Sequence, residues 1–323
     1  MITSLVYRDH KLFAQDPSLD ELAILRAEPG VMIWIDLAQP STEETTQVLE
    51  KLFCFHPLAI EDCVNDTPFP KLEAYDDYLY FVMHAVDTSE APAFKTTELD
   101  LFLGKNFLVT FHHLPLSPVN AALERFLRTA SDPVRGPDRF AHTILDNMVE
   151  AYKPPLEALR LEIDNVEEGV LREMSAEELF PKVVALRKQL SRLRQIVRPQ
   201  REIAVELAQG KHPFIRTAIV PYLRDLGEEL GRIETQTQVW AEQLILSFRI
   251  YINKSSHEAN AGIRVLTAIT ALTFPSLLIG GWYGMNFQHM PELGLFHGYP
   301  LAFALMLAGT YATYLFMRRK KWL

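Results

Sequence analysis

Two long apolar segments near the C-terminal end place the strongest constraint on how this chain can fold. Residues 263–283 contain 21 amino acids with a single charge, that of Arg264, and residues 299–317 contain 19 with none. A helix of about 20 residues spans the roughly 30 Å of hydrocarbon in a bilayer. Continuous apolar runs without a polar face suit lipid better than a soluble core. The pair therefore predicts a transmembrane hairpin, with two buried core helices as the alternative.

The charges that flank the two spans predict the orientation of the hairpin. Basic residues 318–321 follow the second span, and Lys254 and Arg264 lie at the entrance of the first. Positive flanks stay in the cytoplasm, which places both ends inside and the loop 284–298 outside. The first residues lack the apolar core of a signal peptide. We therefore expect a multi-pass protein of the cell inner (plasma) membrane, with cytoplasmic N- and C-termini.

The residues that precede the spans form a strongly acidic body. Removing the five basic residues and one acidic residue of 263–323 from the totals of 32 and 41 leaves 27 basic and 40 acidic side chains in 1–262, a net charge of −13. Such a body does not suit nucleic acid, whose phosphates need basic partners, and it attracts cations. Two cysteines are too few for a disulfide framework or a cysteine-rich zinc site.

Residues 1–135 have the pattern of a cytosolic α/β domain. Segments 31–37 and 78–86 are rich in β-branched and aromatic residues, which predicts strands. Segment 99–113 reads as two strands joined by a turn. A capping-box sequence predicts that a helix begins within 41–53.

A turn-rich linker at 131–139 leads to residues 136–262, which have the pattern of long stalk helices. Apolar residues alternate there at spacings of three and four, the heptad pattern of a helical bundle. The third helical segment meets no proline between Pro221 and Pro275, so one helix is predicted to continue into the first span of the hairpin at 263–323. No other segment of one chain is long enough to cover the apolar heptad residues along the whole of this helix. We therefore expect an oligomer in which these helices pack around an axis. The heptad segments are 156–170, 179–197 and 223–244.

Continuing the heptad into the first span marks one stripe of the helix. The stripe is almost wholly apolar, and around an axis it would form a hydrophobic constriction that gates by dewetting. Residues that face lipid or another helix fit the same periodicity, so spacing alone leaves both interpretations open. The members are Ile263, Leu266, Thr270, Phe274 (or Thr273), Leu277 and Gly281.

The first span ends in polar backbone at Tyr283-Gly284-Met285-Asn286. Polar backbone at membrane depth is tolerated only where protein or water covers it, and glycine permits a tight turn. Mg²⁺ holds its water shell tightly, so a neutral ring of asparagine oxygens can bind the hydrated ion through its waters. Glu292, six residues further on, would place negative charge at the outer mouth.

The YGMNF sequence at 283–287, followed by MPEL at 290–293, resembles the signature loop of the CorA family of divalent-cation channels. The order of long helix, span, loop, span and basic tail is also similar, as is segment 56–82, so the resemblance covers essentially the whole chain. It implies an α+β membrane protein with a cytosolic αβα domain, long stalk helices and a two-helix hairpin. It also implies a homopentamer around a central pore that passes Mg²⁺, and often Co²⁺ or Ni²⁺.

The resemblance implies roles for particular residues of the pore. Gly284, Met285 and Asn286 would bind incoming hydrated ions at the loop. Ile263 and Leu266 would form the apolar gate near the cytosolic end of the span.

The resemblance further implies a sensor of cytosolic Mg²⁺ between neighbouring subunits. Its carboxylates would be those of Glu61 and Asp62 and, on the stalk helix, that of Asp225. Bridging ions would hold the subunits together and close the pore, and their loss would loosen the assembly. Cys63 beside Asp62 is a softer ligand that invites zinc or cobalt, and Leu277 is apolar where some members are polar.

Three alternatives stay open. A ZntB-type zinc transporter shares the architecture but typically lacks the GMNF and MPEL combination. A membrane-anchored sensor or scaffold that binds divalent ions without passing them explains the acidic body but not the GMN turn. A tethered enzyme is the third; because His84 and His112-His113 occur without a metalloenzyme motif, we expect no enzymatic activity.

Overall fold

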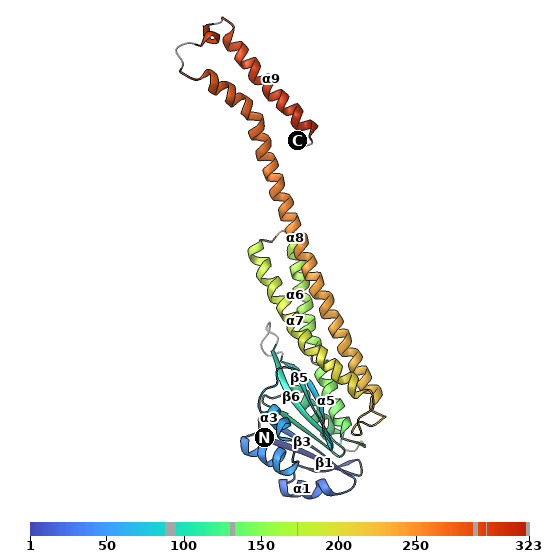
Figure 1. Ribbon diagram of the computed structural model, residues 1–323. Coiled ribbons are helices and arrows are strands. Elements are labelled where there is room, and N and C mark those ends of the chain that lie inside the picture. Colours follow the sequence, from blue (N-terminus) through green and yellow to red (C-terminus); the bar gives the residue numbers. More distant parts are fainter. Residues whose placement is uncertain (88–94, 130–132, 173, 287–289, 295, 321–323) are drawn as a thin grey trace. The chain divides into compact units, whose positions relative to one another are not determined.

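The computed structural model divides the chain into two compact units, Met1–Leu246 and Ser247–Leu323. The boundary falls within a single long helix, α8 (Figure 1). The sheet and the first helical hairpin therefore belong to one unit, and the two apolar segments belong to the other. The structure describes residues 1–87, 95–129, 133–172, 174–286, 290–294 and 296–320.

The first unit is built on a seven-stranded sheet with the order β2-β1-β3-β7-β6-β5-β4. Within the described chain, β3 and β7 are the only parallel neighbours, and Ile33 aligns with Phe107. The strands predicted at 31–37, 78–86 and 99–113 are confirmed as β3, β5 and the β6–β7 pair. The strands are β1 (Ile2–Arg8), β2 (Lys11–Gln15), β3 (Val31–Ala38), β4 (Lys71–Ala74), β5 (Tyr78–Asp87), β6 (Lys95–Gly104) and β7 (Phe107–His112).

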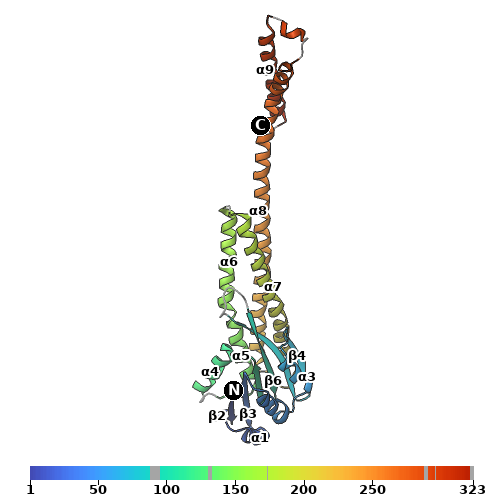
Figure 2. The same ribbon diagram turned by 90° about the vertical axis from the view of Figure 1, so that its left-hand side faces the viewer.

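Helices cover both faces of the sheet, which gives the predicted αβα layers (Figure 2). Strand β3 is apolar on both faces because both are buried. Ile33 and Ile35 belong to the core under the first set of helices. Trp34 faces the second set and stacks on Phe140 with ring centroids 5.5 Å apart. The first set is α1 (Leu19–Ala27), α2 (Thr42–Thr45), the π-helix η1 (Thr46–Leu52) and α3 (Pro57–Val64); the second is α4 (Ser117–Arg128) and α5 (Asp138–Glu150).

Capping explains where two of these helices begin. The predicted capping box is present at α2, where the Ser41 side chain accepts from the backbone N–H of Glu44 and the Glu44 carboxylate accepts from the backbone N–H of Ser41. A second capping box opens α1, between Ser18 and Glu21. Both helices therefore begin where their first orphan donors find side-chain acceptors.

Three long helices follow: α6 (Lys153–Leu171) and α7 (Ala176–Leu207) lie within the first unit, and α8 (Val220–Tyr283) begins there and continues into the second. Almost every residue of the three predicted heptad seams is buried, as expected for helices that pack along them. Gly210, with φ of +65°, lies in the turn that follows α7. The prediction of an unbroken helix into the first apolar segment is confirmed, because α8 continues for 64 residues.

The predicted linker at 131–139 is partly helix. Residues 130–132 lie outside the described part of the chain, but α5 begins at Asp138. The Asp138 side chain is buried and pairs with Arg216, whose Nε donates to Oδ1 at 2.8 Å and whose backbone N–H donates to Oδ2 at 2.9 Å. This pair fixes the α7–α8 connection to the start of α5.

The second unit contains the end of α8 and helix α9 (Gly298–Arg319). Both helices are long and apolar enough to cross a bilayer by length and composition. Between them, the described residues include a short 3₁₀ turn, η2 (Pro291–Gly294).

Candidate functional site

The loop residues predicted to bind the ion follow directly on α8. The backbone N–H of Gly284 donates to the carbonyl of Gly280 at 3.0 Å, and that of Met285 donates to Trp282 at 3.4 Å. A Cβ on residue 284 would lie only 2.9 Å from the Gly280 oxygen. Glycine is therefore required here by close backbone approach, in agreement with the turn expected from the sequence.

Met285 and Asn286 follow this turn and are both exposed. Met285 is 47% exposed, and Asn286 is exposed as well. Among the described residues, no hydrogen bond to the Asn286 amide is present, so both its oxygen and its nitrogen are available to a ligand. Phe287 and the side chain of Glu292 lie outside the described residues.

The six stripe positions of the first span share one exposed face of α8. Their exposure reaches 60% at Ile263, 66% at Leu266 and 70% at Leu277. Apolar side chains this exposed are typical of a surface that contacts another chain or lipid, or that lines a dewetted pore. Thr270 keeps its hydroxyl bonded to the carbonyl of Leu266 at 2.9 Å, which reduces the polarity of the stripe.

Helix α9 packs on the opposite face of α8. Gly309 of α9 lies against Pro275, and Thr310 Oγ1 approaches Ser276 Oγ at 3.3 Å and donates to the Leu272 carbonyl at 3.4 Å. At 3.6 residues per turn, these α8 contact positions lie about 170° around the helix from the middle of the stripe. The hairpin partner of the same chain therefore leaves the stripe uncovered.

The predicted sensor carboxylates of α3 lie at the surface of the first unit. Glu61 is exposed, and the Asp62 side chain is 39% exposed and forms an ion pair with Lys71. Lys71 Nζ also donates to Glu73 Oε1 at 3.0 Å. Burial opposes the charge of Lys71, but the hydrogen bonds to the two carboxylates outweigh it and raise the pKa of the lysine.

Asp225, the third predicted sensor residue, is exposed on α8. Within the described residues of one chain, no group of three histidine, cysteine, aspartate or glutamate side chains is arranged to hold a metal ion. One copy alone therefore does not complete a sensor site, and the role of Glu61, Asp62 and Asp225 stays a prediction that requires a second copy.

Cys63 is not a partner for a metal at Asp62, because the two side chains point in different directions. Cys63 is fully buried in the core under α3, while Asp62 faces solvent. Burial, followed by the charge of Asp100, raises the pKa of the thiol well above its usual value. The zinc or cobalt preference expected from this cysteine therefore has no support in its placement.

A buried acidic pair on β6 escaped the sequence reasoning. Tyr80 Oη donates to Asp100 Oδ1 at 2.6 Å, and the backbone N–H of Thr67 donates to Glu98 Oε2 at 2.5 Å. Burial raises the pKa of Glu98 to about 7, and burial together with the charge of Glu98 raises that of Asp100 well above its usual value. The signal was the Glu98-Leu99-Asp100 alternation, which places both acids on one face of a strand.

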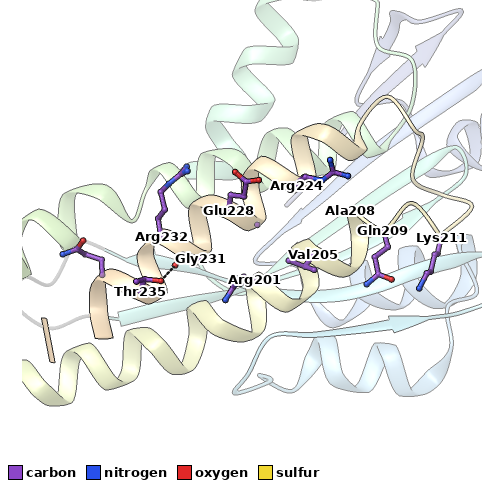
Figure 3. Close-up of a pocket in the computed structure, with 12 residues that line it drawn as sticks. Arg201, Val205, Ala208, Gln209, Lys211, Arg224, Glu228, Gly231, Arg232 and Thr235 are labelled. Carbon is purple, nitrogen blue, oxygen red and sulfur yellow. Dashed lines mark hydrogen bonds between the residues drawn. The ribbon is translucent and has the colours of Figure 1, made fainter. Parts of the chain in front are cut away.

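A groove of about 1090 Å³ lies between α7 and α8 of the first unit (Figure 3). Its charged lining is mostly basic, with Arg224 and Arg232 on α8 and Lys211 beyond the end of α7. Arg201 also lines it and pairs with Glu234 at 2.9 Å. A basic lining does not attract divalent cations. The groove contains none of the residues predicted for transport or sensing.

Comparison with known proteins identifies the family. The model of the CorA-like Mg²⁺ transporter protein family matches residues 29–319, which is most of the chain. The chain belongs to this family of divalent-cation transporters.

Curated relatives match along most of the chain. The cobalt/magnesium transport protein CorA of Thermotoga maritima is 29% identical over 294 residues, which cover 90% of this chain and 83% of that protein. The protein of the same name from Methanocaldococcus jannaschii is 24% identical, with 95% and 96% covered.

Solved structures share the fold. The complete CorA magnesium transporter of M. jannaschii superposes with a TM-score of 0.79 at 22% identity and covers 100% of this chain and 99% of that one. Full-length CmaX gives 0.78 at 18% identity, with 99% and 97% covered. The cytoplasmic domain of ZntB from Vibrio parahaemolyticus gives 0.57 at 12%, with 70% and 88% covered. Because proteins with different names share this fold, the fold alone does not identify the transported ion.

Proposed function

We propose that the protein is a homopentameric channel for Mg²⁺ whose ion path runs along the stripe of α8. The observation that carries this proposal is the placement of α9 opposite the stripe, which leaves an apolar face free to line an axis. The loop residues Gly284, Met285 and Asn286 follow at the outer end of the same helix. Relatives named as cobalt/magnesium transport proteins support Mg²⁺ as cargo and Co²⁺ as a further ion. We extend the proposal to Ni²⁺ as another divalent cation of this class.

Ion entry depends on binding without dehydration. Mg²⁺ gives up its waters reluctantly, so a selective site does best to hydrogen-bond the water shell. Asn286 supplies an uncharged oxygen and an exposed amide, and five copies would form a ring of such groups. Glu292 would add negative charge at the outer mouth and raise the local concentration of cations.

The gate in this proposal is the apolar end of the stripe. Rings of Ile263 and Leu266 would repel water when the helices are close, and a hydrated ion cannot enter a dry segment. Separation of the helices would wet the segment and admit the ion. Thr270, Phe274, Leu277 and Gly281 would continue the lining towards the loop.

Closure would depend on cytosolic Mg²⁺ held between Glu61, Asp62 and Asp225 of neighbouring copies. Asp62 forms an ion pair with the ammonium group of Lys71, so its carboxylate is placed where a positive charge can bind. Bridging ions would favour the closed assembly, and their loss would leave like charges that repel. We further infer cytoplasmic N- and C-termini in the cell inner membrane, and no enzymatic role.

The test is Mg²⁺ entry into liposomes that contain the purified protein and an internal Mg²⁺-sensitive dye. Asn286→Ala is expected to abolish most of the flux, whereas Asn120→Ala, an exposed asparagine on α4, is expected to leave it unchanged. Equal flux in Asn286→Ala and in the unmodified protein would contradict ion selection at the loop.

The same assay separates the alternatives. Zn²⁺ uptake without Mg²⁺ uptake, across internal Mg²⁺ from chelated to millimolar, would assign the protein to the zinc-transporting branch. No flux of any divalent ion from folded, oligomeric protein would leave a membrane-anchored sensor or scaffold.

A further inference from the structure

The ammonium group of Lys71 lies against Asp62, one of the predicted sensor carboxylates. Its ammonium contacts Asp62 Oδ2, lies 3.0 Å from Glu73 Oε1, and stands 5.2 Å from the centre of the Tyr80 ring. The side chain is only 26% exposed. Two carboxylates and an aromatic face therefore hold a single positive charge in place.

The local fold holds this arrangement. Lys71 and Glu73 are two residues apart on the edge strand β4, so both side chains lie on the same face, and Glu73 aligns with Tyr80 on β5. Tyr75 Oη donates to Glu73 Oε2 at 2.9 Å and fixes that carboxylate. Asp62 approaches from α3, which packs on this face of the sheet.

We propose that Lys71 is a tethered competitor of Mg²⁺ for Asp62 and sets the cytosolic Mg²⁺ concentration at which the pore closes. This inference rests on the proposed sensor. Lys71 contacts Oδ2 of Asp62 and keeps a positive charge next to the second oxygen, so Asp62 coordinates a divalent ion most readily while this ion pair is open. The apparent dissociation constant for Mg²⁺ is therefore the intrinsic one divided by the fraction of time that the pair is open, so a pair that is mostly closed weakens binding.

The size of the effect follows from the strength of a partly exposed ion pair. Such pairs are formed for most of the time but not all of it, because solvent screens them. Removing the ammonium is expected to lower the Mg²⁺ concentration for half-closure by about three- to tenfold. A lysine that merely supported the fold would change the stability without Mg²⁺ and leave this concentration unchanged.

The experiment uses the full-length protein and two readouts. The first is the internal Mg²⁺ concentration that halves flux into liposomes. The second is the Mg²⁺ concentration that half-protects the detergent-solubilised protein from limited trypsin digestion. Lys71→Met is expected to lower both midpoints three- to tenfold. Lys71→Arg, which keeps the charge, is expected to stay within twofold of the unmodified protein.

Two further variants control for charge and for the site. Lys11→Met removes an exposed lysine from β2, with the same change in net charge, and is expected to leave both midpoints unchanged. In an Asp62→Asn background, Lys71→Met is expected to have no further effect, because the contested carboxylate is gone.

The possible failures are distinguishable. If Asp62→Asn shifts the midpoints and Lys71→Met does not, the competition is refuted and the proposed channel stands. If neither variant shifts them, Asp62 is not the sensor and the inference falls with it. If no variant conducts Mg²⁺, the proposed function fails, while the digestion midpoints still decide whether Lys71 competes at Asp62.

Discussion

Gly309 of α9 lies against Pro275 of α8 so closely that a Cβ at position 309 would be 3.0 Å from the proline Cβ. Proline cannot donate the helical hydrogen bond to the residue four positions earlier, so the carbonyl of Ala271 lacks its usual partner. Thr310, the next residue of α9, donates to the neighbouring carbonyl of Leu272 at 3.4 Å. The two helices therefore meet closely where the backbone of the first span is weakest.

Gly309→Val is expected to destabilise the hairpin. Forcing a branched side chain into this contact costs about 1 to 3 kcal/mol, as for other overpacked sites. The measurement is the thermal midpoint of the purified protein in detergent. Gly262→Ala is the matched control, because no atom lies within 4 Å of its Cβ position, and alanine favours a helix over glycine. Equal midpoints for Gly309→Val and the unmodified protein would show that the helices do not meet here.

Leu266→Asn is expected to weaken closure of the pore. A polar ring in the stripe removes the barrier to water, so flux should persist at internal Mg²⁺ concentrations that silence the unmodified channel. Ile269→Asn is the control, since Ile269 is exposed but lies about 100° around α8 from the stripe. Loss of closure in both variants, or in Ile269→Asn alone, would argue against the assigned face.

Glu98→Gln is expected to stabilise the first unit at neutral pH. The pKa of Glu98 rises from 4.5 to about 7 on folding, so the folded chain binds a proton more strongly than the unfolded chain. Stability therefore falls as the pH rises from about 4.5 through the folded-state pKa near 7, by about 2 to 3 kcal/mol from this group, and levels off about one pH unit above that pKa. The variant should lose this part of the pH dependence.

Denaturant unfolding at pH 5 and pH 8 measures the difference. Glu124→Gln serves as the control, because Glu124 is exposed and its pair with Arg128 is a surface pair of small effect. A pH dependence that is the same in Glu98→Gln and in the unmodified protein would mean that the buried carboxyl does not titrate in this range.

Arg216→Ala is expected to be among the most destabilising changes in the helical part of the first unit. It leaves the carboxylate of Asp138, whose side chain is 1% exposed, without its charged partner, at a cost of about 3 to 5 kcal/mol. Arg198→Ala removes an arginine from an exposed pair with Glu202 on α7 and should cost less than about 1 kcal/mol. Denaturant midpoints of the two variants test this ranking, and similar values would refute it.

Much of the fold was predictable because it follows from local periodicity. The heptad seams located the long helices, the absence of proline between Pro221 and Pro275 predicted the continuity of α8, and the capping box at Ser41 marked one helix start. The order of the strands was not predictable in this way, because β3 pairs with a strand more than 70 residues further along. Strands β1 and β2, at one edge of the sheet, carried no separate signal.

The candidate site was predictable to the extent that its residues are neighbours in sequence. The glycine at 284 and the stripe of α8 follow from spacing within one helix and its end. The pairs Lys71–Asp62 and Arg216–Asp138 join separate elements, so only the tertiary fold brings them together. The exposure of the stripe also required the structure, since periodicity does not tell which face the second helix of the hairpin covers.

The parallel pairing of β3 with β7 has a consequence for biogenesis. Because Ile33 aligns with Phe107, the sheet cannot close until both distant segments have left the ribosome, and such non-local pairing makes folding slow. The apolar helices are synthesised after the whole α/β unit. The acidic body therefore has time to fold in the aqueous phase before the hairpin becomes available for insertion, which keeps its slow step apart from the membrane.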